Sequence, residues 1–286
     1  MVSIIERLNR IRLRRWGLRS DTFRGPHGEV HWMDGPGQGQ APPLVLVHGL
    51  SSQATQYRKL VAHLRQDHQR LILPDLLAHG WSEHPTERLN TARVYAALRD
   101  LLDERLGEPA VLFGNSLGGY LAMRYASERP ERVRALVVHS PGGGPLPPPR
   151  REELLDRFRL HDHRRALELV DRSLTDIGKL RHLAAFMVRQ QFARPQIRLL
   201  LDSVTEEDEF TPAHLERLTM PVLLMWGQRD RVLEEEQLKF FQHHLPSHAR
   251  VERPPDYGHT PHLERDRDLA QRIRSFLQEA QILRQG

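Results

Sequence analysis

Ser116 is the residue in this sequence that is best placed to do chemistry. It lies in the run GNSLGG at 114–119. The apolar run 110–113 before it predicts a buried strand, and residues 120–126 after it predict a helix. A serine on so tight a strand-to-helix turn is held out of the sheet, and glycines at 114 and 118 avoid collisions with neighbouring backbone. The sequence therefore predicts a serine nucleophile on an exposed turn.

An aspartate and a histidine follow two later predicted strands. Asp230 comes after the apolar run 221–226, and His259 comes after a strand predicted near 249–252. A serine hydroxyl is a weak nucleophile until a base removes its proton, and histidine can do this near pH 7. A carboxylate fixes the imidazole tautomer and stabilises the imidazolium. The chain order Ser116, Asp230, His259 therefore predicts a catalytic triad whose activity falls at roughly pH 6 to 7 as the histidine protonates.

Two backbone N–H groups are candidates for an oxyanion hole. The apolar run 44–47 predicts a strand buried on both faces of a parallel sheet, and it ends at His48-Gly49. A glycine there lets the next N–H turn into the site, which makes Leu50 the first candidate donor. Leu117 is the second, because it opens the helix that follows the serine.

Other polar residues near these strand ends are interpreted as structural. His48 is read as a histidine that holds its own loop. Asp75 also follows a predicted strand, but it precedes the serine in the chain, so it is read as a carboxylate that braces a loop. Ser51 and Ser52 lie on no predicted elbow and are weak alternatives to Ser116.

Strands and helices alternate through most of the chain, which predicts an α/β fold with a mostly parallel sheet covered by helices on both faces. This alternation stops at 140–149, a run rich in proline and glycine that cannot form helix or interior strand. Residues 150–218 then show only helical patterns. The expected organisation is an N-terminal helix at 1–20, a core domain at 21–140 and 219–286, and a helical cap inserted at 141–218.

The cap is expected to cover the strand ends, where open α/β sheets bind their ligands. Four apolar cap residues are candidates for a substrate pocket, with mutual packing of the cap helices as an equally good explanation for each. They are Phe186, Met187, Phe192 and Leu199.

The first 20 residues combine apolar residues at helical spacing with many arginines. Such a helix can lie on an anionic membrane surface, or it can pack on the core or on a partner chain. Packing is favoured, because one short helix gives only marginal membrane affinity. The sequence has no run long enough to span a bilayer and no signal-peptide core, so a cytoplasmic location is expected, with peripheral membrane contact through residues 1–20 left open.

Composition narrows the remaining function classes. The chain has no cysteine, which excludes disulfides and a thiolate nucleophile. Its net charge is +5, but the arginines are scattered and no nucleic-acid-binding motif is present. The pairs His161/His163 and His243/His244 have no carboxylate in a zinc-ligand arrangement. No cofactor, no metal and no nucleic acid are therefore expected, and the chain is expected to be a monomer or a homodimer.

Five motifs together resemble those of the α/β-hydrolase superfamily, in particular lidded serine esterases and lipases. They are HG at 48–49, PDL with HGxS at 74–82, GNSLGG at 114–119, WGxxD at 226–230 and GHxPHLE at 258–264. The resemblance implies a mainly parallel sheet of about eight strands with a cap inserted after the sixth. It also implies a serine hydrolase that cleaves carboxylic esters, including lipidic ones, through an acyl-enzyme and without a cofactor.

The superfamily contains other chemistries, and the sequence separates them. Haloalkane dehalogenases and epoxide hydrolases use an aspartate where this chain has Ser116. Carbon–carbon bond hydrolases of the meta-cleavage type resemble this chain at the elbow and at Pro141-Gly142-Gly143, but they usually place a tryptophan where this chain has Thr260. The cap length and the run 226–232 resemble monoacylglycerol-lipase-like members more closely. A ligand-binding receptor on this fold is a third alternative, although such relatives often lose a triad residue.

Overall fold

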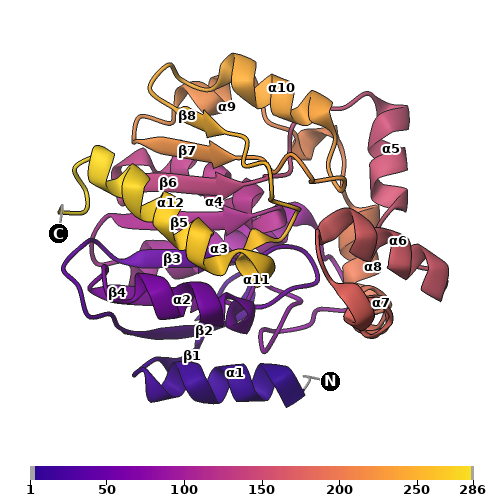
Figure 1. Ribbon diagram of the computed structural model, residues 1–286, viewed down its shortest axis with the longest axis horizontal. Coiled ribbons are helices and arrows are strands. Elements are labelled where there is room, and N and C mark those ends of the chain that lie inside the picture. Colours follow the sequence, from indigo (N-terminus) through magenta and orange to yellow (C-terminus); the bar gives the residue numbers. More distant parts are fainter. Residues whose placement is uncertain (1–3, 285–286) are drawn as a thin grey trace.

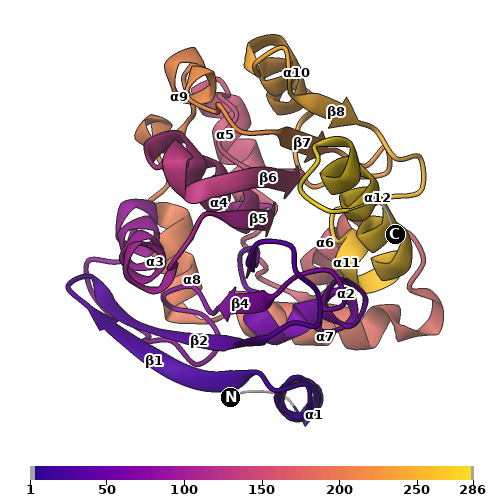
Figure 2. The same cartoon turned by 90° about the vertical axis from the view of Figure 1, so that its left-hand side faces the viewer.

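The computed structural model of the protein describes residues 4–284. One sheet of eight strands runs through it in the order β1-β2-β4-β3-β5-β6-β7-β8 (Figures 1 and 2). The pairs β1–β2 and β2–β4 are antiparallel, and every other neighbouring pair is parallel. The strands are β1 (Arg19–Gly25), β2 (Gly28–Pro36), β3 (Leu44–Val47), β4 (Arg70–Pro74), β5 (Ala110–Asn115), β6 (Val133–His139), β7 (Val222–Met225) and β8 (Arg250–Glu252). The predicted α/β-hydrolase sheet is confirmed.

Helices cover both faces of the sheet because alternate residues of each buried strand point to opposite sides. On β5, Leu112 packs toward α3 (Thr91–Arg105), α4 (Leu117–Glu128) and α10 (Glu235–His244). Its neighbours Val111 and Phe113 pack toward α2 (Arg58–Leu64) and α12 (Asp266–Glu279). The shortest core helices are α9 (Pro212–Glu216) and α11 (Pro261–Glu264). Figure 2 shows these two helical layers on either side of the sheet.

The segment between β6 and β7 carries the cap, on the right in Figure 1. Its helices are α5 (Pro148–Asp156), α6 (His163–Ser173), α7 (Arg181–Phe192) and α8 (Pro195–Asp202). They share an apolar cluster of their own, which runs from Leu160 to Leu201 and includes Val232. Phe210, Leu215 and Leu218 instead belong to the main core. The cap cluster is therefore shorter than the expected insertion at 141–218.

Two sequence-based boundaries are wrong. The proline-rich run was not expected to be helical, yet α5 begins at Pro148, because the first turn of a helix needs no N–H at that position. The N-terminal helix α1 (Ile4–Arg15) is shorter than 1–20, and Arg19 already begins strand β1. This edge strand carries one buried residue, Phe23, so alternation of apolar residues could not reveal it.

Helix α1 packs on the core through Leu13, which is fully buried, and through a hydrogen bond from Arg58 Nε to Asn9 Oδ1 of 2.8 Å. Within residues 4–284, no helix is both long enough and apolar enough to cross a membrane.

Candidate active site

Ser116 occupies a strained turn between β5 and α4. Its φ of 57° and ψ of −120° put a non-glycine residue in a conformation that few residues adopt. A Cβ at Gly114 would lie 2.3 Å from the Gly118 carbonyl oxygen, and one at Gly118 would lie 2.1 Å from the Val47 carbonyl oxygen. The geometry confirms that this turn needs glycine at 114 and 118, because close backbone contacts hold the serine in place.

Asp230 and His259 are joined by a hydrogen bond. His259 Nδ1 lies 2.7 Å from Asp230 Oδ2, and the two side chains are 8% and 0% exposed. The other carboxylate oxygen, Oδ1, accepts from the Val232 N–H at 2.9 Å. Burial by itself raises the pKa of Asp230, but the charge of His259 and its hydrogen bond lower it further, to about 2. Asp230 therefore stays ionised and can orient the imidazole with Nδ1 as donor.

Ser116 and His259 line the same cavity, beneath the cap. No hydrogen bond joins the two side chains in residues 4–284. Such contacts are often long in proteins without bound substrate. The three predicted residues thus come together at the carboxyl ends of β5, β7 and β8, with the Asp–His pair already formed.

Asn115 fixes the histidine loop from the other side of the serine. Its amide Nδ2 donates to the His259 carbonyl at 2.9 Å and to the His139 carbonyl at 3.2 Å. Burial lowers the pKa of the neighbouring His139 to about 3, so this histidine is neutral. Sequence reasoning missed both residues. The position of Asn115 directly before the serine was a usable signal, but nothing local marks His139.

Leu50 and Leu117 lie on either side of Ser116. Leu117 is the first residue of α4, so its N–H is one of those that have no acceptor within the helix. The loop before Leu50 lies against the serine, because a Cβ at Gly49 would be 3.4 Å from the Ser116 Cβ. Both leucines line a cavity together with Ser116. This placement is compatible with the predicted oxyanion hole.

His48 has the structural role that the sequence suggested. Its Nδ1 donates to the Gly49 carbonyl at 2.8 Å, and its Nε2 accepts from the Leu76 N–H at 2.9 Å. His79 supports the same loop, since its Nε2 accepts from the Ser51 N–H at 3.0 Å. Burial lowers the pKa of both histidines, to about 3 for His79. Both are therefore neutral supports of the loop that carries Leu50.

Asp75 braces two loops, as expected. Its buried carboxylate accepts from the Ala54 N–H at 2.7 Å and the Trp81 N–H at 3.0 Å, and His31 Nδ1 lies 2.8 Å away. With its oxygens occupied in this way and no contact to His259, it is not the triad acid.

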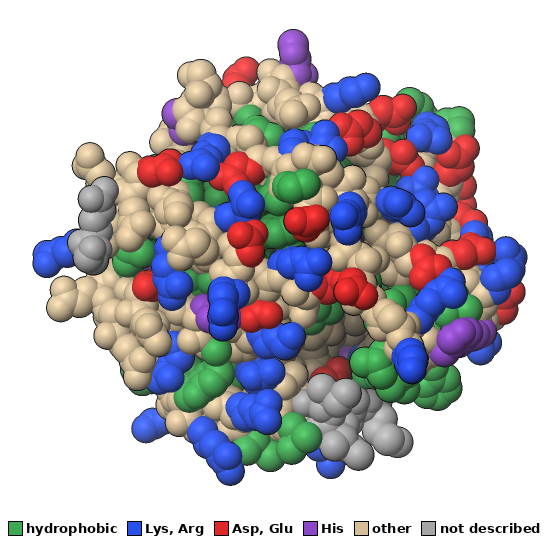
Figure 3. Space-filling view, in the orientation of Figure 1, with side chains coloured by type: hydrophobic (Ala, Val, Ile, Leu, Met, Phe, Trp, Pro, Cys, Tyr) green, Lys and Arg blue, Asp and Glu red, His purple; other side chains and the backbone are tan. Residues whose placement is uncertain are grey.

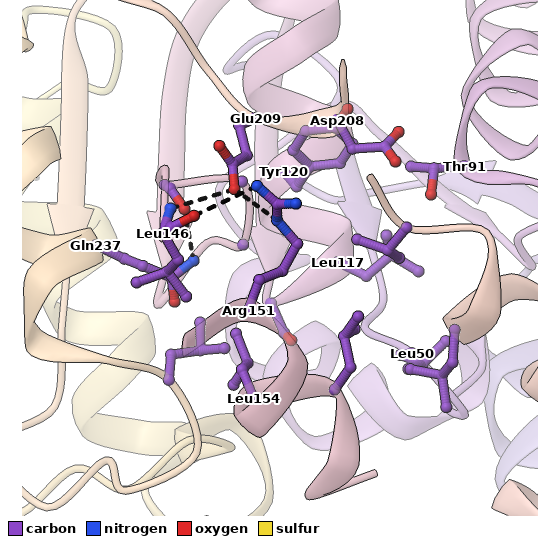
Figure 4. A pocket seen from close by; sticks show the side chains of 18 of the residues that line it. Leu50, Thr91, Leu117, Tyr120, Leu146, Arg151, Leu154, Asp208, Glu209 and Gln237 are labelled. Atoms are coloured by element: carbon purple, nitrogen blue, oxygen red, sulfur yellow. Dashed lines mark hydrogen bonds and ion pairs between the residues drawn. The ribbon is translucent and has the colours of Figure 1, made fainter. Parts of the chain in front are cut away.

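A first cavity, of about 140 Å³, extends from Ser116 between α4 and the cap helices α5 and α8. Figure 4 shows Leu50, Leu117 and Leu154 along its apolar part. Polar side chains gather at another part of its wall, where Arg151 Nε donates to Glu209 Oε1 at 3.0 Å. The cavity thus leads from the serine along apolar walls toward an ion pair.

A second cavity, of about 270 Å³, holds His259 and opens between α6, α7 and the loop after β3. Met187 and Phe192 line it, as predicted from the sequence. Phe186 and Leu199 do not: they are 55% and 41% exposed on the outside of the cap, and neither lines a cavity at Ser116. Their placement in the pocket is corrected. Phe158 lines both cavities and stacks on Phe192, with ring centroids 5.8 Å apart.

This fold, with a serine elbow after β5, an Asp–His pair after later strands and a cap between β6 and β7, defines an α/β hydrolase. A sequence model of the alpha/beta hydrolase family matches residues 44–272. The chain belongs to this family. In the described residues, no cluster of three or more histidine or acidic side chains is arranged to hold a metal ion.

Individual relatives carry several chemistries. Lipase 3 of Moraxella sp. (strain TA144) is 26% identical over 251 residues, covering 82% of this chain and 76% of the relative. A membrane phospholipase A described as a bacterial virulence factor superposes with a TM-score of 0.82 at 21% identity, over 97% of this chain and 91% of the other. A 2-hydroxy-6-oxo-6-phenylhexa-2,4-dienoate hydrolase from Rhodococcus sp. strain RHA1 superposes with a TM-score of 0.74 at 23% identity, over 91% and 99%. At such identities the two structures are similar in fold alone.

Proposed function

We propose that this protein is a serine hydrolase that cleaves carboxylic esters, with Ser116 as nucleophile, His259 as general base and Asp230 as the group that orients it. The observation that carries the proposal is the 2.7 Å contact between His259 Nδ1 and an ionised, fully buried Asp230, in a cavity that Ser116 shares with the imidazole. A carboxylate held in this way has one evident chemical use, which is to keep Nε2 of the imidazole free to accept a proton.

The proposed reaction has two halves. His259 Nε2 takes the hydroxyl proton while Ser116 Oγ bonds to the ester carbonyl carbon, and the negative charge on the carbonyl oxygen meets the N–H groups of Leu50 and Leu117. The tetrahedral intermediate expels the alcohol, which receives the proton from His259, and an acyl-enzyme remains. Water then attacks this ester with His259 again as base, which releases the acid and restores the serine.

The two cavities suggest where each half of the ester binds. The first has apolar walls from Leu117 to Leu154 and suits the acyl chain. The second holds His259, which must deliver a proton to the leaving alcohol, and therefore suits the alcohol. The lipase names among the relatives support an apolar acyl group.

The decisive experiment is the hydrolysis of p-nitrophenyl esters from acetate to palmitate, by the protein and by its Ser116→Ala variant. We expect turnover to fall by about 10³-fold or more in the variant, with unfolding midpoints unchanged. An optimum at an intermediate chain length is expected, because the acyl cavity ends at the Arg151–Glu209 ion pair. Equal turnover in both proteins would contradict the proposal, as would the absence of turnover on every ester.

A carbon–carbon bond hydrolase acting on a vinylogous diketone is the second candidate. The glycines of the meta-cleavage-like run, Gly142 and Gly143, line the cavity that contains Ser116, and one relative by structure is such a hydrolase. Ser116-dependent cleavage of a vinylogous diketone without ester hydrolysis would favour this reaction. A ligand-binding receptor, the third alternative, would bind esters but turn over neither substrate.

A further inference from the structure

Helix α1 exposes apolar side chains on the face that does not pack on the core. Leu8 and Ile11 lie one helical turn apart and are 53% and 48% exposed, whereas Leu13 on the opposite face is fully buried. A helix whose only task is packing turns its apolar residues inward. The outward pair is therefore a feature that packing on the core does not explain.

Arginines surround this outward pair. Arg7 and Arg12 adjoin it in sequence, and Arg15 follows Ile11 by four positions on the same face. These three side chains are exposed, and none of them forms an ion pair within residues 4–284. Elsewhere on the surface, many arginines are paired with acidic neighbours, as Arg181 is with Asp171 on the cap. Figure 3 shows basic side chains beside hydrophobic ones along the lower edge, where α1 lies.

The cap continues this apolar surface. Figures 1 and 2 both place α7 next to α1. Glu6 of α1, Ala184 and Met187 of α7 and Leu263 of α11 line the same second cavity, so the three helices meet at its opening. The exposed hydrophobic residues of these segments form what we call the apolar rim: Leu8, Ile11, Leu180, Leu183, Phe186 and Leu263.

We infer that the apolar rim is a docking surface for an anionic lipid bilayer. Exposed leucine, isoleucine and phenylalanine side chains can enter the acyl boundary, while unpaired arginines beside them bind acidic headgroups. This occupant accounts for both features, since a second copy of the chain would bring its own arginines to the contact and repel them. Several segments contribute, which overcomes the marginal affinity of one short helix.

The position of the rim gives the docking a consequence. It surrounds the opening of the cavity that holds Ser116 and His259. A docked molecule would receive an acyl ester directly from the bilayer. This consequence rests on the proposed function, whereas lipid binding itself does not.

Flotation with vesicles tests the inference. We expect the full chain to float with vesicles of phosphatidylcholine and phosphatidylglycerol, and to bind pure phosphatidylcholine vesicles at least about tenfold more weakly. Charge reversal by Arg7→Glu with Arg12→Glu should lower binding by a similar factor, and so should Leu8→Glu with Leu183→Glu. The matched controls are Arg134→Glu on β6 and Leu199→Glu on α8, exposed residues outside the rim that should leave binding unchanged.

The remaining arms separate the competing outcomes. Ser116→Ala should float as the natural chain does, so failure of the esterase proposal leaves this test intact. Circular dichroism of each variant establishes that it is folded. Equal binding to neutral and anionic vesicles, or equal loss in the control variants, would overturn the inference. So would light scattering that shows a dimer dissolved by Leu183→Glu with no flotation, because the rim would then join two copies.

Discussion

Asp230 shows how burial and one partner determine the chemistry of a residue. Its side chain is fully enclosed and still ionised, because His259 and a backbone N–H accept the charge. An amide at this position can keep the contact only by presenting its oxygen to Nδ1–H or its NH₂ to a bare Nδ1. The second arrangement puts the proton on Nε2, where it blocks the base.

We therefore expect Asp230→Asn to lower kcat by about 10³- to 10⁴-fold on p-nitrophenyl esters while the fold is retained. Steady-state kinetics beside a denaturant titration measures both quantities. Asp256→Asn is the matched control, since that aspartate lies in the neighbouring loop with its side chain 62% exposed. A loss below about tenfold for Asp230→Asn would remove the residue from the triad.

The strand–elbow–helix element depends on close contact between β3, β5 and α4. The Val47 carbonyl lies where a Cβ at residue 118 would be, so the start of α4 packs directly on the end of β3. That contact positions the loop of Leu50 against Ser116. The strain at Ser116 is held by backbone that has no room to relax.

Gly118→Ala should therefore destabilise the protein by about 3 kcal/mol and abolish ester turnover, because the strand and the helix must separate. Gly107→Ala is the matched substitution, since a Cβ there meets no atom within 4 Å. It should change stability by less than about 0.5 kcal/mol. Urea unfolding of both variants measures the difference, and a stable, active Gly118→Ala would show that the elbow can open.

The cap helices show what helical spacing can and cannot assign. Ile197, Leu200 and Leu201 share one face of α8 and are buried, while Leu199 lies on another face and is exposed. On α7 the buried residues are Ala185 and Phe192, seven positions apart. Reading faces by the helical period would have placed Leu199 outside the pocket. Phe186 was misplaced for the same reason.

At the scale of the whole molecule, several histidines are buried in the neutral form. Burial lowers the pKa of His79, His139 and His262 to about 3. The unfolded chain takes up a proton at each of them below about pH 6.5. The unfolded state therefore binds more protons over this range, and stability falls as the pH is lowered.

We expect the free energy of unfolding to be constant from pH 8 to 7 and then to fall, approaching about 4 kcal/mol per pH unit near pH 5 as three protons are taken up. Urea titrations at successive pH values measure the slope. His262→Leu should reduce that slope by about 1.4 kcal/mol per unit, whereas His243→Gln, on an exposed side chain, should leave it unchanged. Equal stability at pH 7 and 5 would contradict neutral burial.

The sequence by itself determined the alternation of strands and helices, the elbow at Ser116 and the acid and base that follow later strands. These features depend on local patterns: apolar runs, glycines beside a serine, and polar residues directly after strands. It also showed that a helical segment interrupts the sheet after the sixth strand. For the same reason, the roles of His48 and Asp75 as loop supports were predictable.

Only the tertiary structure decided which cap residues face the serine, that Asn115 holds the His259 loop, and that α1 packs on the core and still exposes Leu8 and Ile11. The edge strand β1 also needed its partner β2 to be recognised. Each of these depends on contacts between segments far apart in the chain. Residues of the same type, such as Leu199 and Leu200, differ only in what the rest of the fold brings against them.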